Sequence, residues 1–193
     1  MRSWPASAAE ETAPGTAPCV RILGLDPGLR HTGWGIIEAR GNRLSFVADG
    51  VLEPDPKLSL AARLKILFEG VQDLVTRYAP HECAIEDTFV NQNPASTLKL
   101  GHARAAAMLA PANAGIPVAE YKPNLVKKSV VGAGHAQKAQ IAAMMRVLLP
   151  GSRSGSEDAA DALAVAICHA HHRASAKALA RQGAPLEHPA VRK

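Results

Sequence analysis

Residues 23–35 read LGLDPGLRHTGWG and place a single acid, Asp26, at the end of a short apolar run. Pro27 and Gly28 follow it directly, and this pair favours a tight turn. A second apolar run begins at Gly33. The stretch therefore predicts two strands joined by a turn, with the Asp26 carboxylate presented where the first strand ends.

The pattern around this turn predicts an α/β fold. Apolar runs at 20–25, 33–38 and 44–52 are separated by Gly and Asn, which is typical of an antiparallel three-strand meander. Ser59 can cap a helix over 60–78. After it we expect strands at 83–85 and 116–119 and helices at 96–113, 123–130, 137–149 and 157–171. These elements together predict a mixed five-stranded sheet flanked by helices.

The chain of 193 residues is long enough for one domain with a full hydrophobic core. We expect this domain over 19–173, a disordered extension over 1–18 and a disordered tail over 174–193. No apolar run approaches the roughly 20 residues of a membrane helix, and the first residues lack the apolar segment of a signal peptide. The sequence thus predicts a cytoplasmic protein without a membrane anchor. The three cysteines are far apart and have no metal-binding or disulfide spacing.

The net charge of +5 favours an anionic partner, and the positive charge is concentrated in one part of the chain. Residues 98–149 contain one acid, Glu120, and seven bases. These bases are Lys99, Arg104, Lys122, Lys127, Lys128, Lys138 and Arg146. The second half of the domain is therefore expected to carry a basic face.

Four acids are candidates for a shared site. Asp158 and Asp161 are three residues apart, which places them on one face of the predicted last helix. Glu86 ends an apolar strand, as Asp26 does. Taken singly, Asp158 also suits a helix N-terminus and each strand-end acid also suits solvent.

Taken together, the four acids predict a site for divalent cations. Carboxylates held close together cannot all ionise unless a cation lies among them. Oxygen ligands favour Mg²⁺ or Mn²⁺ over zinc. Two such ions form the usual apparatus for phosphodiester cleavage, and the basic face suits a polyanionic substrate.

Four segments resemble, in order and spacing, the signature blocks of RuvC-type Holliday-junction resolvases of the ribonuclease H-like superfamily. They are LGLDPGLRHTGWG, AIEDTFVNQNPASTLKLGHARA, VKKSVVGAGHAQKAQ and DAADALAVAICH. The resemblance covers residues 20–173. It implies a ribonuclease H-like fold in which the catalytic metal ligands are Asp26, Glu86, Asp158 and Asp161. Some members carry His at the position that matches Asp158.

The resemblance also implies a homodimer that acts on four-way junction DNA, together with the branch-migration proteins RuvA and RuvB. It implies that Phe89 stacks on bases near the crossover and that Lys127 and Lys138 contact phosphate. Further candidates for DNA contact are Asn91, Ser96, Lys99, Arg104 and Lys128; for Lys99, Arg104 and Lys128 the alternative is a side chain that is merely solvated. The small residues of the 96–113 helix suit either a dimer interface or packing inside the monomer.

The sequence analysis favours a Mg²⁺-dependent, structure-selective endodeoxyribonuclease. It is expected to resolve Holliday junctions by paired nicks, with two metal ions per site, and to leave 5′-phosphate and 3′-hydroxyl ends; Mn²⁺ is expected to substitute. The alternative within nucleases is a YqgF-like or ribonuclease H-like enzyme acting on RNA or RNA–DNA hybrid.

Two readings from other classes fit less well. A sugar-kinase or actin-like ATPase needs a duplicated domain, for which this chain is too short. A junction-binding protein without catalysis has no need of four acids. The histidines near the end of the last helix, His169, His171 and His172, are read as helix-end cations.

Overall fold

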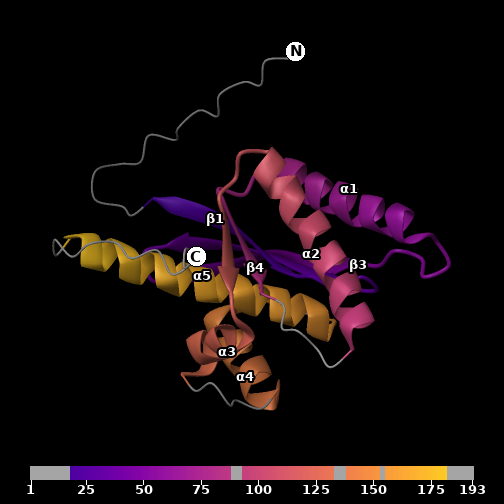
Figure 1. Ribbon diagram of the computed structural model, residues 1–193. Coiled ribbons are helices and arrows are strands. Elements are labelled where there is room, and N and C mark those ends of the chain that lie inside the picture. The colour runs from indigo at the N-terminus through magenta and orange to yellow at the C-terminus, as the bar shows by residue number, and fades with distance from the viewer. Residues whose placement is uncertain (1–17, 88–92, 133–137, 153–154, 182–193) are drawn as a thin grey trace.

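The computed structural model describes residues 18–87, 93–132, 138–152 and 155–181 (Figure 1). In this part of the chain one mixed sheet has the strand order β3-β2-β1-β4-β5. Its strands are β1 (Cys19–Asp26), β2 (Thr32–Arg40), β3 (Arg43–Leu52), β4 (Glu82–Glu86) and β5 (Val118–Tyr121). The first three strands pair antiparallel, whereas β4 runs parallel to β1 and β5 parallel to β4. The predicted α/β fold with an antiparallel meander is confirmed.

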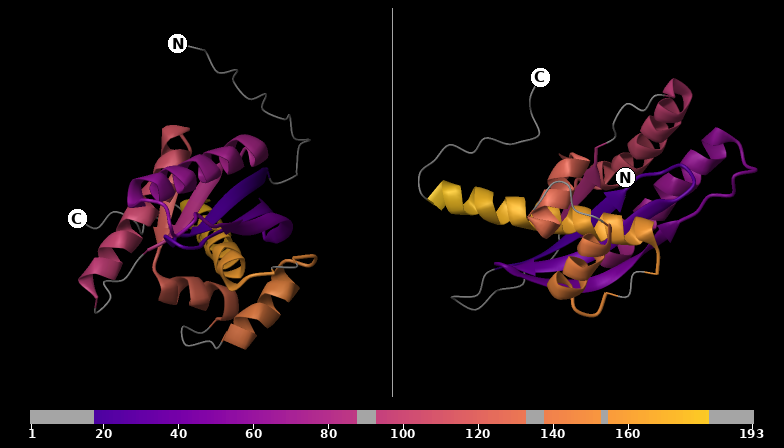
Figure 2. Two further views of the ribbon diagram at one scale, coloured as in Figure 1. Left: turned by 90° about the vertical axis from the view of Figure 1, so that its right-hand side faces the viewer. Right: turned by 90° about the horizontal axis from the view of Figure 1, so that it is seen from below.

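Helices cover both faces of the sheet, as the two views of Figure 2 show. They are α1 (Leu60–Tyr78), α2 (Pro94–Asn113), α3 (Pro123–Val131), α4 (Lys138–Leu148) and α5 (Glu157–Arg181). Helices α1 and α2 lie over one face, and α5 lies over the other with α3 and α4 beside it (Figure 1). Each face has its own apolar core: Leu25 and Ile85 face α1 and α2, whereas Ile22 and Ala84 face α5.

Two of the differences from the predicted element boundaries have a structural explanation. Strand β5 lies two residues later than expected, because the Ile116 amide donates to the Pro111 carbonyl in the turn that closes α2 (3.0 Å). Helix α5 continues beyond His171 to Arg181, into the stretch that was expected to be disordered. Residues 174–181 contain alternating alanines and no Gly or Pro, so the helix has no local reason to stop.

Helix α5 packs unusually close to the sheet. A Cβ atom added at Gly24 would collide with the Ala162 carbonyl, and one added at Gly33 would collide with the Asp158 carbonyl. The absence of side chains on the strands lets backbone lie against backbone, and alanines on the helix serve the same purpose. The amino-terminal half of α5 is thereby fixed over β1 and β2.

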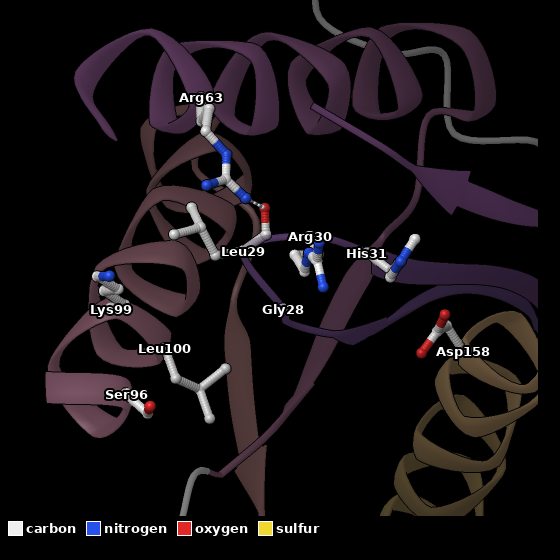
Figure 3. Close-up of a pocket in the computed structure, with 9 residues that line it drawn as sticks. All are labelled: Gly28, Leu29, Arg30, His31, Arg63, Ser96, Lys99, Leu100 and Asp158. Carbon is white, nitrogen blue, oxygen red and sulfur yellow. Dashed lines mark hydrogen bonds between the residues drawn. The ribbon is translucent and has the colours of Figure 1, made fainter. Parts of the chain in front are cut away.

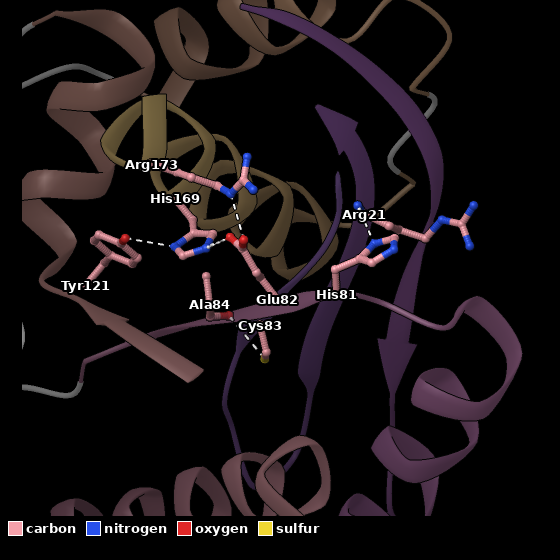
Figure 4. Close-up of polar contacts among 8 residues, drawn as sticks. All are labelled: Arg21, His81, Glu82, Cys83, Ala84, Tyr121, His169 and Arg173. Carbon is pink, nitrogen blue, oxygen red and sulfur yellow. Dashed lines mark hydrogen bonds and ion pairs between the residues drawn. The ribbon is translucent and has the colours of Figure 1, made fainter. Parts of the chain in front are cut away.

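A polar network holds α5 to the far end of β4 (Figure 4). The Glu82 carboxylate accepts from Arg173 Nε at 2.6 Å and lies 2.8 Å from His169 Nε2. The other nitrogen of His169 lies 2.8 Å from the Tyr121 hydroxyl on β5. Burial alone would raise the pKa of Glu82, but its hydrogen bonds with His169 and Arg173 outweigh burial and lower this pKa to about 2.

This network corrects the reading of His169 as a helix-end cation. The residue lies well inside α5 and has specific partners on two strands. No helix in the described residues has the length and apolar character needed to span a membrane.

We expect Glu82→Gln to lower the free energy of unfolding at pH 7 by roughly 1–3 kcal/mol, because the folded state stabilises the charged carboxylate. The pKa of Glu82 is lower in the folded state than in the unfolded chain. Its contribution is therefore present above pH 4.5 and lost as the pH falls toward 2. Urea denaturation at pH 7 and at pH 3 should show the difference between wild type and variant shrinking at the lower pH.

Glu69→Gln is the matched control, because Glu69 pairs with Lys65 on the exposed face of α1. Its effect should stay within about 0.5 kcal/mol. An equally small effect of Glu82→Gln would contradict the stabilising role of the network.

Candidate functional site

Asp26 and Glu86 lie side by side at one edge of the sheet. Each is the last residue of its strand, and the parallel register pairs Leu25 with Ile85 just before them. Successive side chains of a strand point to opposite faces. Since Leu25 and Ile85 face α1 and α2, the two carboxylates face α5.

Helix α5 brings the other two acids to this edge. Ser156 Oγ accepts a hydrogen bond from the Ala159 amide (3.1 Å) and caps the start of the helix. Asp158 and Asp161 follow in the first turns; Asp158 is half-buried and Asp161 is exposed. The contact between Gly33 and the Asp158 backbone fixes how near these turns approach the strands.

The four acids, which we call the acidic cluster, act on one another electrostatically. Burial raises the pKa of Asp26, and its proximity to Glu86, Asp161 and Asp158 raises it further, to about 8. A hydrogen bond joins the side chains of Asp26 and Glu86. The structure thus brings together all four acids that the sequence analysis singled out.

Lys127 contributes a positive charge to the same site. Burial raises the pKa of Glu86, and the charges of Asp161 and Asp87 act in the same direction. The charge of Lys127, on α3, acts in the opposite direction and lowers this pKa. Lys127, one of the predicted phosphate contacts, therefore lies close enough to the acidic cluster to act on Glu86.

The donor set of the acidic cluster suits hard divalent cations, because it consists of carboxylate oxygens alone. In the described residues, no three Asp, Glu, His or Cys side chains are already arranged around one ion position. Binding of a cation would therefore require the carboxylates to rotate toward one another.

The turn that presents Asp26 is fixed by residues that the sequence analysis did not identify. The buried Thr32 hydroxyl donates to the Gly28 carbonyl at 2.7 Å and accepts from the Gly28 amide at 3.2 Å. Arg63 of α1 donates to the Leu29 carbonyl at 2.8 Å. Thr32 is only four residues from Gly28, so the sequence around the turn could have predicted the Thr32 hydrogen bonds. Arg63 is 34 residues from Leu29, and no local pattern could have predicted that hydrogen bond.

A pocket of about 490 Å³ opens beside Asp158, between α2 and α5 (Figure 3). Its basic lining comes from α1, from α2 and from the turn after β1: Arg30, His31, Arg63 and Lys99. Ser96 and Lys99 therefore lie where a strand of nucleic acid could approach the acidic cluster. Sequence reasoning proposed these two residues but missed Arg30 and Arg63.

The remaining predicted DNA contacts fall into three groups. Lys128 is exposed on α3. Arg104 is engaged inside the protein, where it contacts Glu86, Asp87 and Glu120. Phe89 and Asn91 lie outside the described residues, as does the side chain of Lys138, whose backbone begins α4.

Comparison with known proteins gives a consistent result. A family model described as crossover junction endodeoxyribonuclease RuvC matches residues 22–169. The crossover junction endodeoxyribonuclease RuvC of Rhodospirillum rubrum is 62% identical over 161 residues, covering 83% of this chain and 95% of that protein. The protein of the same name from Paramagnetospirillum magneticum is 59% identical over 162 residues, covering 84% and 98%.

A solved structure is also similar. The RuvC of T. thermophilus in complex with a Holliday junction substrate has a TM-score of 0.76 and 30% sequence identity, covering 81% of this chain and 96% of that chain. The similarity therefore extends over nearly the whole of each relative.

We expect Asp26→Asn to stabilise the protein in EDTA at pH 8. The pKa of Asp26 is higher in the folded state than in the unfolded chain, so the charged carboxylate costs stability as the pH rises from about 4 to about 8. The variant removes this charge, and its melting temperature should exceed that of wild type by several degrees at pH 8 and converge with it near pH 4. Asp73→Asn, on the exposed face of α1, is the control. Equal melting temperatures at pH 8 would contradict the repulsion.

Proposed function

We propose that this chain, which belongs to the RuvC family of crossover junction endodeoxyribonucleases, cuts Holliday junctions at its acidic cluster. The family membership makes it a metal-dependent nuclease, and the finer assignment of the metal ligands is our proposal. The ligands would be Asp26, Glu86, Asp158 and Asp161. The observation that supports it is the position of Asp26, whose pKa is raised by burial and, in addition, by the nearby charges of Glu86, Asp161 and Asp158.

The four acids come from three elements of the fold, β1, β4 and α5. Asp26 and Glu86 come from rigid strand ends, so their carboxylates have little freedom to move away from a ligand. Asp158 and Asp161 come from α5, which covers the face of the sheet toward which the other two carboxylates point. Two bound Mg²⁺ ions would activate a water for attack on phosphorus and stabilise the leaving 3′ oxygen, which gives 5′-phosphate and 3′-hydroxyl ends. Mn²⁺, which accepts the same ligands, would substitute.

Basic side chains on two sides of the acidic cluster would bind the DNA backbone. Lys127 lies on α3, and Arg30, Arg63 and Lys99 line the pocket beside Asp158. A phosphate chain that runs through this pocket reaches the acids with its negative charge compensated. Lys128, Lys138, Ser96 and Asn91 remain proposed backbone contacts, and Phe89 remains a proposed base-stacking residue.

A homodimer would give two sites for paired nicks, with a two-fold axis that matches the symmetry of the junction. Helix α2 has a buried face lined with alanines and an exposed face that carries two leucines. Ala103, Ala107 and Ala110 are buried inside the monomer. On the outer side, Leu98 and Leu109 are 62% and 59% exposed and are three helical turns apart on one face.

We propose that the exposed face of α2, which includes Leu98, Gly101 and Leu109, forms the dimer interface. Gly101 lies on the exposed side of the helix, where an added Cβ would meet nothing within 4 Å, so a second copy can approach closely there. Partnership with the branch-migration proteins RuvA and RuvB, implied by the resemblance, is part of the same proposal.

Asp26→Asn should reduce the rate of junction cleavage by roughly 10³-fold or more, about 4 kcal/mol in activation free energy, because it removes a metal ligand. Junction affinity in Ca²⁺ should stay within about threefold, because no basic side chain is changed. The measurements are mapping of paired nicks on a synthetic immobile junction, with and without Mg²⁺, and a gel-shift titration.

Asp73→Asn serves again as the control and should cleave as wild type does. Parallel loss of cleavage and of binding in Asp26→Asn would show that the acid supports the fold rather than the chemistry. Faster cleavage of an RNA–DNA hybrid than of the junction by wild type would overturn the substrate assignment.

Leu109→Glu should convert the dimer to monomer in sedimentation analysis and turn paired nicks into single, uncoordinated ones. The added charge would be buried without a partner in the proposed interface, at a cost of several kcal/mol. Ile66→Glu on the exposed face of α1 is the matched control. A Leu109→Glu variant that stays dimeric would place the interface elsewhere.

A further inference from the structure

Arg104 hydrogen-bonds to the backbone of Glu86, a proposed metal ligand. It extends from the middle of α2, and its Nε donates to the carbonyl oxygen of Glu86 at 3.1 Å. Its side chain is only 17% exposed. The contact falls at the last residue of β4, where the chain leaves the sheet.

The same guanidinium also binds the acids next to this point. Its Nη2 forms an ion pair with Glu120 of β5 and lies 3.6 Å from Asp87 Oδ1. The Asp87 amide donates to the Tyr121 carbonyl at 2.8 Å, so the ends of β4 and β5 are joined directly as well. Arg104 thereby ties the carboxyl ends of two strands to α2.

Arg104 and the Glu86 carboxylate lie on opposite faces of the sheet. Helix α2 lies over the face that contains Ile85, whereas the Glu86 carboxylate faces α5 and hydrogen-bonds with Asp26. The charge that lowers the pKa of Glu86 comes from Lys127. Arg104 therefore acts on where the Glu86 backbone lies, and its own charge is matched by Glu120.

We infer that Arg104 is a positioning residue that fixes the direction in which Glu86 enters the acidic cluster, and that it is not a DNA contact as the sequence analysis expected. The inference rests on the proposed role of Glu86 as a metal ligand. Because Arg104 presents a planar fork of donors to a carbonyl and a carboxylate, lysine cannot reproduce both contacts.

The test compares Arg104→Ala, Arg104→Lys and Glu120→Gln with Arg77→Ala, an exposed position at the end of α1. Mn²⁺ binding is measured without DNA by electron paramagnetic resonance, junction affinity in Ca²⁺ over a range of salt, and cleavage as a function of Mg²⁺. In Arg104→Ala we expect Mn²⁺ affinity to fall about fivefold or more and the Mg²⁺ requirement for cleavage to rise, with kcat reduced roughly 10- to 100-fold. Junction affinity and its salt dependence should be unchanged.

Arg104→Lys should show the same loss of Mn²⁺ affinity although it keeps the charge, and it decides the matter if Arg104→Ala does not fold. Glu120→Gln should change Mn²⁺ affinity less than either, because the bond to the Glu86 carbonyl remains. Weaker junction binding with a salt slope reduced by about one, and unchanged Mn²⁺ binding, would overturn the inference and make Arg104 a phosphate contact. Unchanged Mn²⁺ binding with unchanged junction binding would overturn it too.

The Mn²⁺ measurement keeps this inference separate from the proposed function. If wild type binds Mn²⁺ at the cluster and Arg104→Ala does not, the positioning role stands even if the substrate proves to be something other than a junction. If Glu86→Gln leaves Mn²⁺ binding unchanged, the ligand assignment fails, and with it the premise about Arg104.

Discussion

The close contact between the α5 backbone and the surface of the sheet determines the rest of this structure. Gly24 and Gly33 leave no room for a side chain between strand and helix, so the first turns of α5 lie directly over the ends of β1 and β2. Two acids on the helix then meet two acids on the strands. Burial, the neighbouring Glu86 and the two helix acids together raise the pKa of Asp26.

The favourable polar contacts between β4 and α5 lie at the other end of β4, at Glu82. Strand β4 carries one carboxylate at each end on the α5 face, and the helix passes over both. Glu82 meets His169 and Arg173 and is stabilised as an anion, whereas Glu86 meets other acids and is destabilised. The helix is thus secured to the sheet through His169 and Arg173 at one end of β4, and it contributes acids at the other end.

The sequence predicted what depends on local pattern and left out what depends on distant partners. The meander, the Ser59 cap and the order of helices and strands follow from periodicity and turn residues. The four acids could be proposed because each stands at a strand end or at helical spacing. Arg104 was expected at the DNA because a lysine-rich or arginine-rich stretch gives no information on tertiary contacts; its partner Glu86 is 18 residues away. The pair of His169 and Glu82 is separated by 87 residues, and no periodicity can announce it.

The thin seam between α5 and the strands also bears on how such a protein can lose its activity in evolution. One methyl group at either glycine would collide with the backbone of α5 and force the turns that carry two of the four acids away from the strands, while every charged residue stayed in the sequence. A sequence comparison that checks only the four acidic positions would classify such a protein as active. The more sensitive signature of a working site in this fold is therefore an uncharged residue, glycine, on the strands beneath the helix.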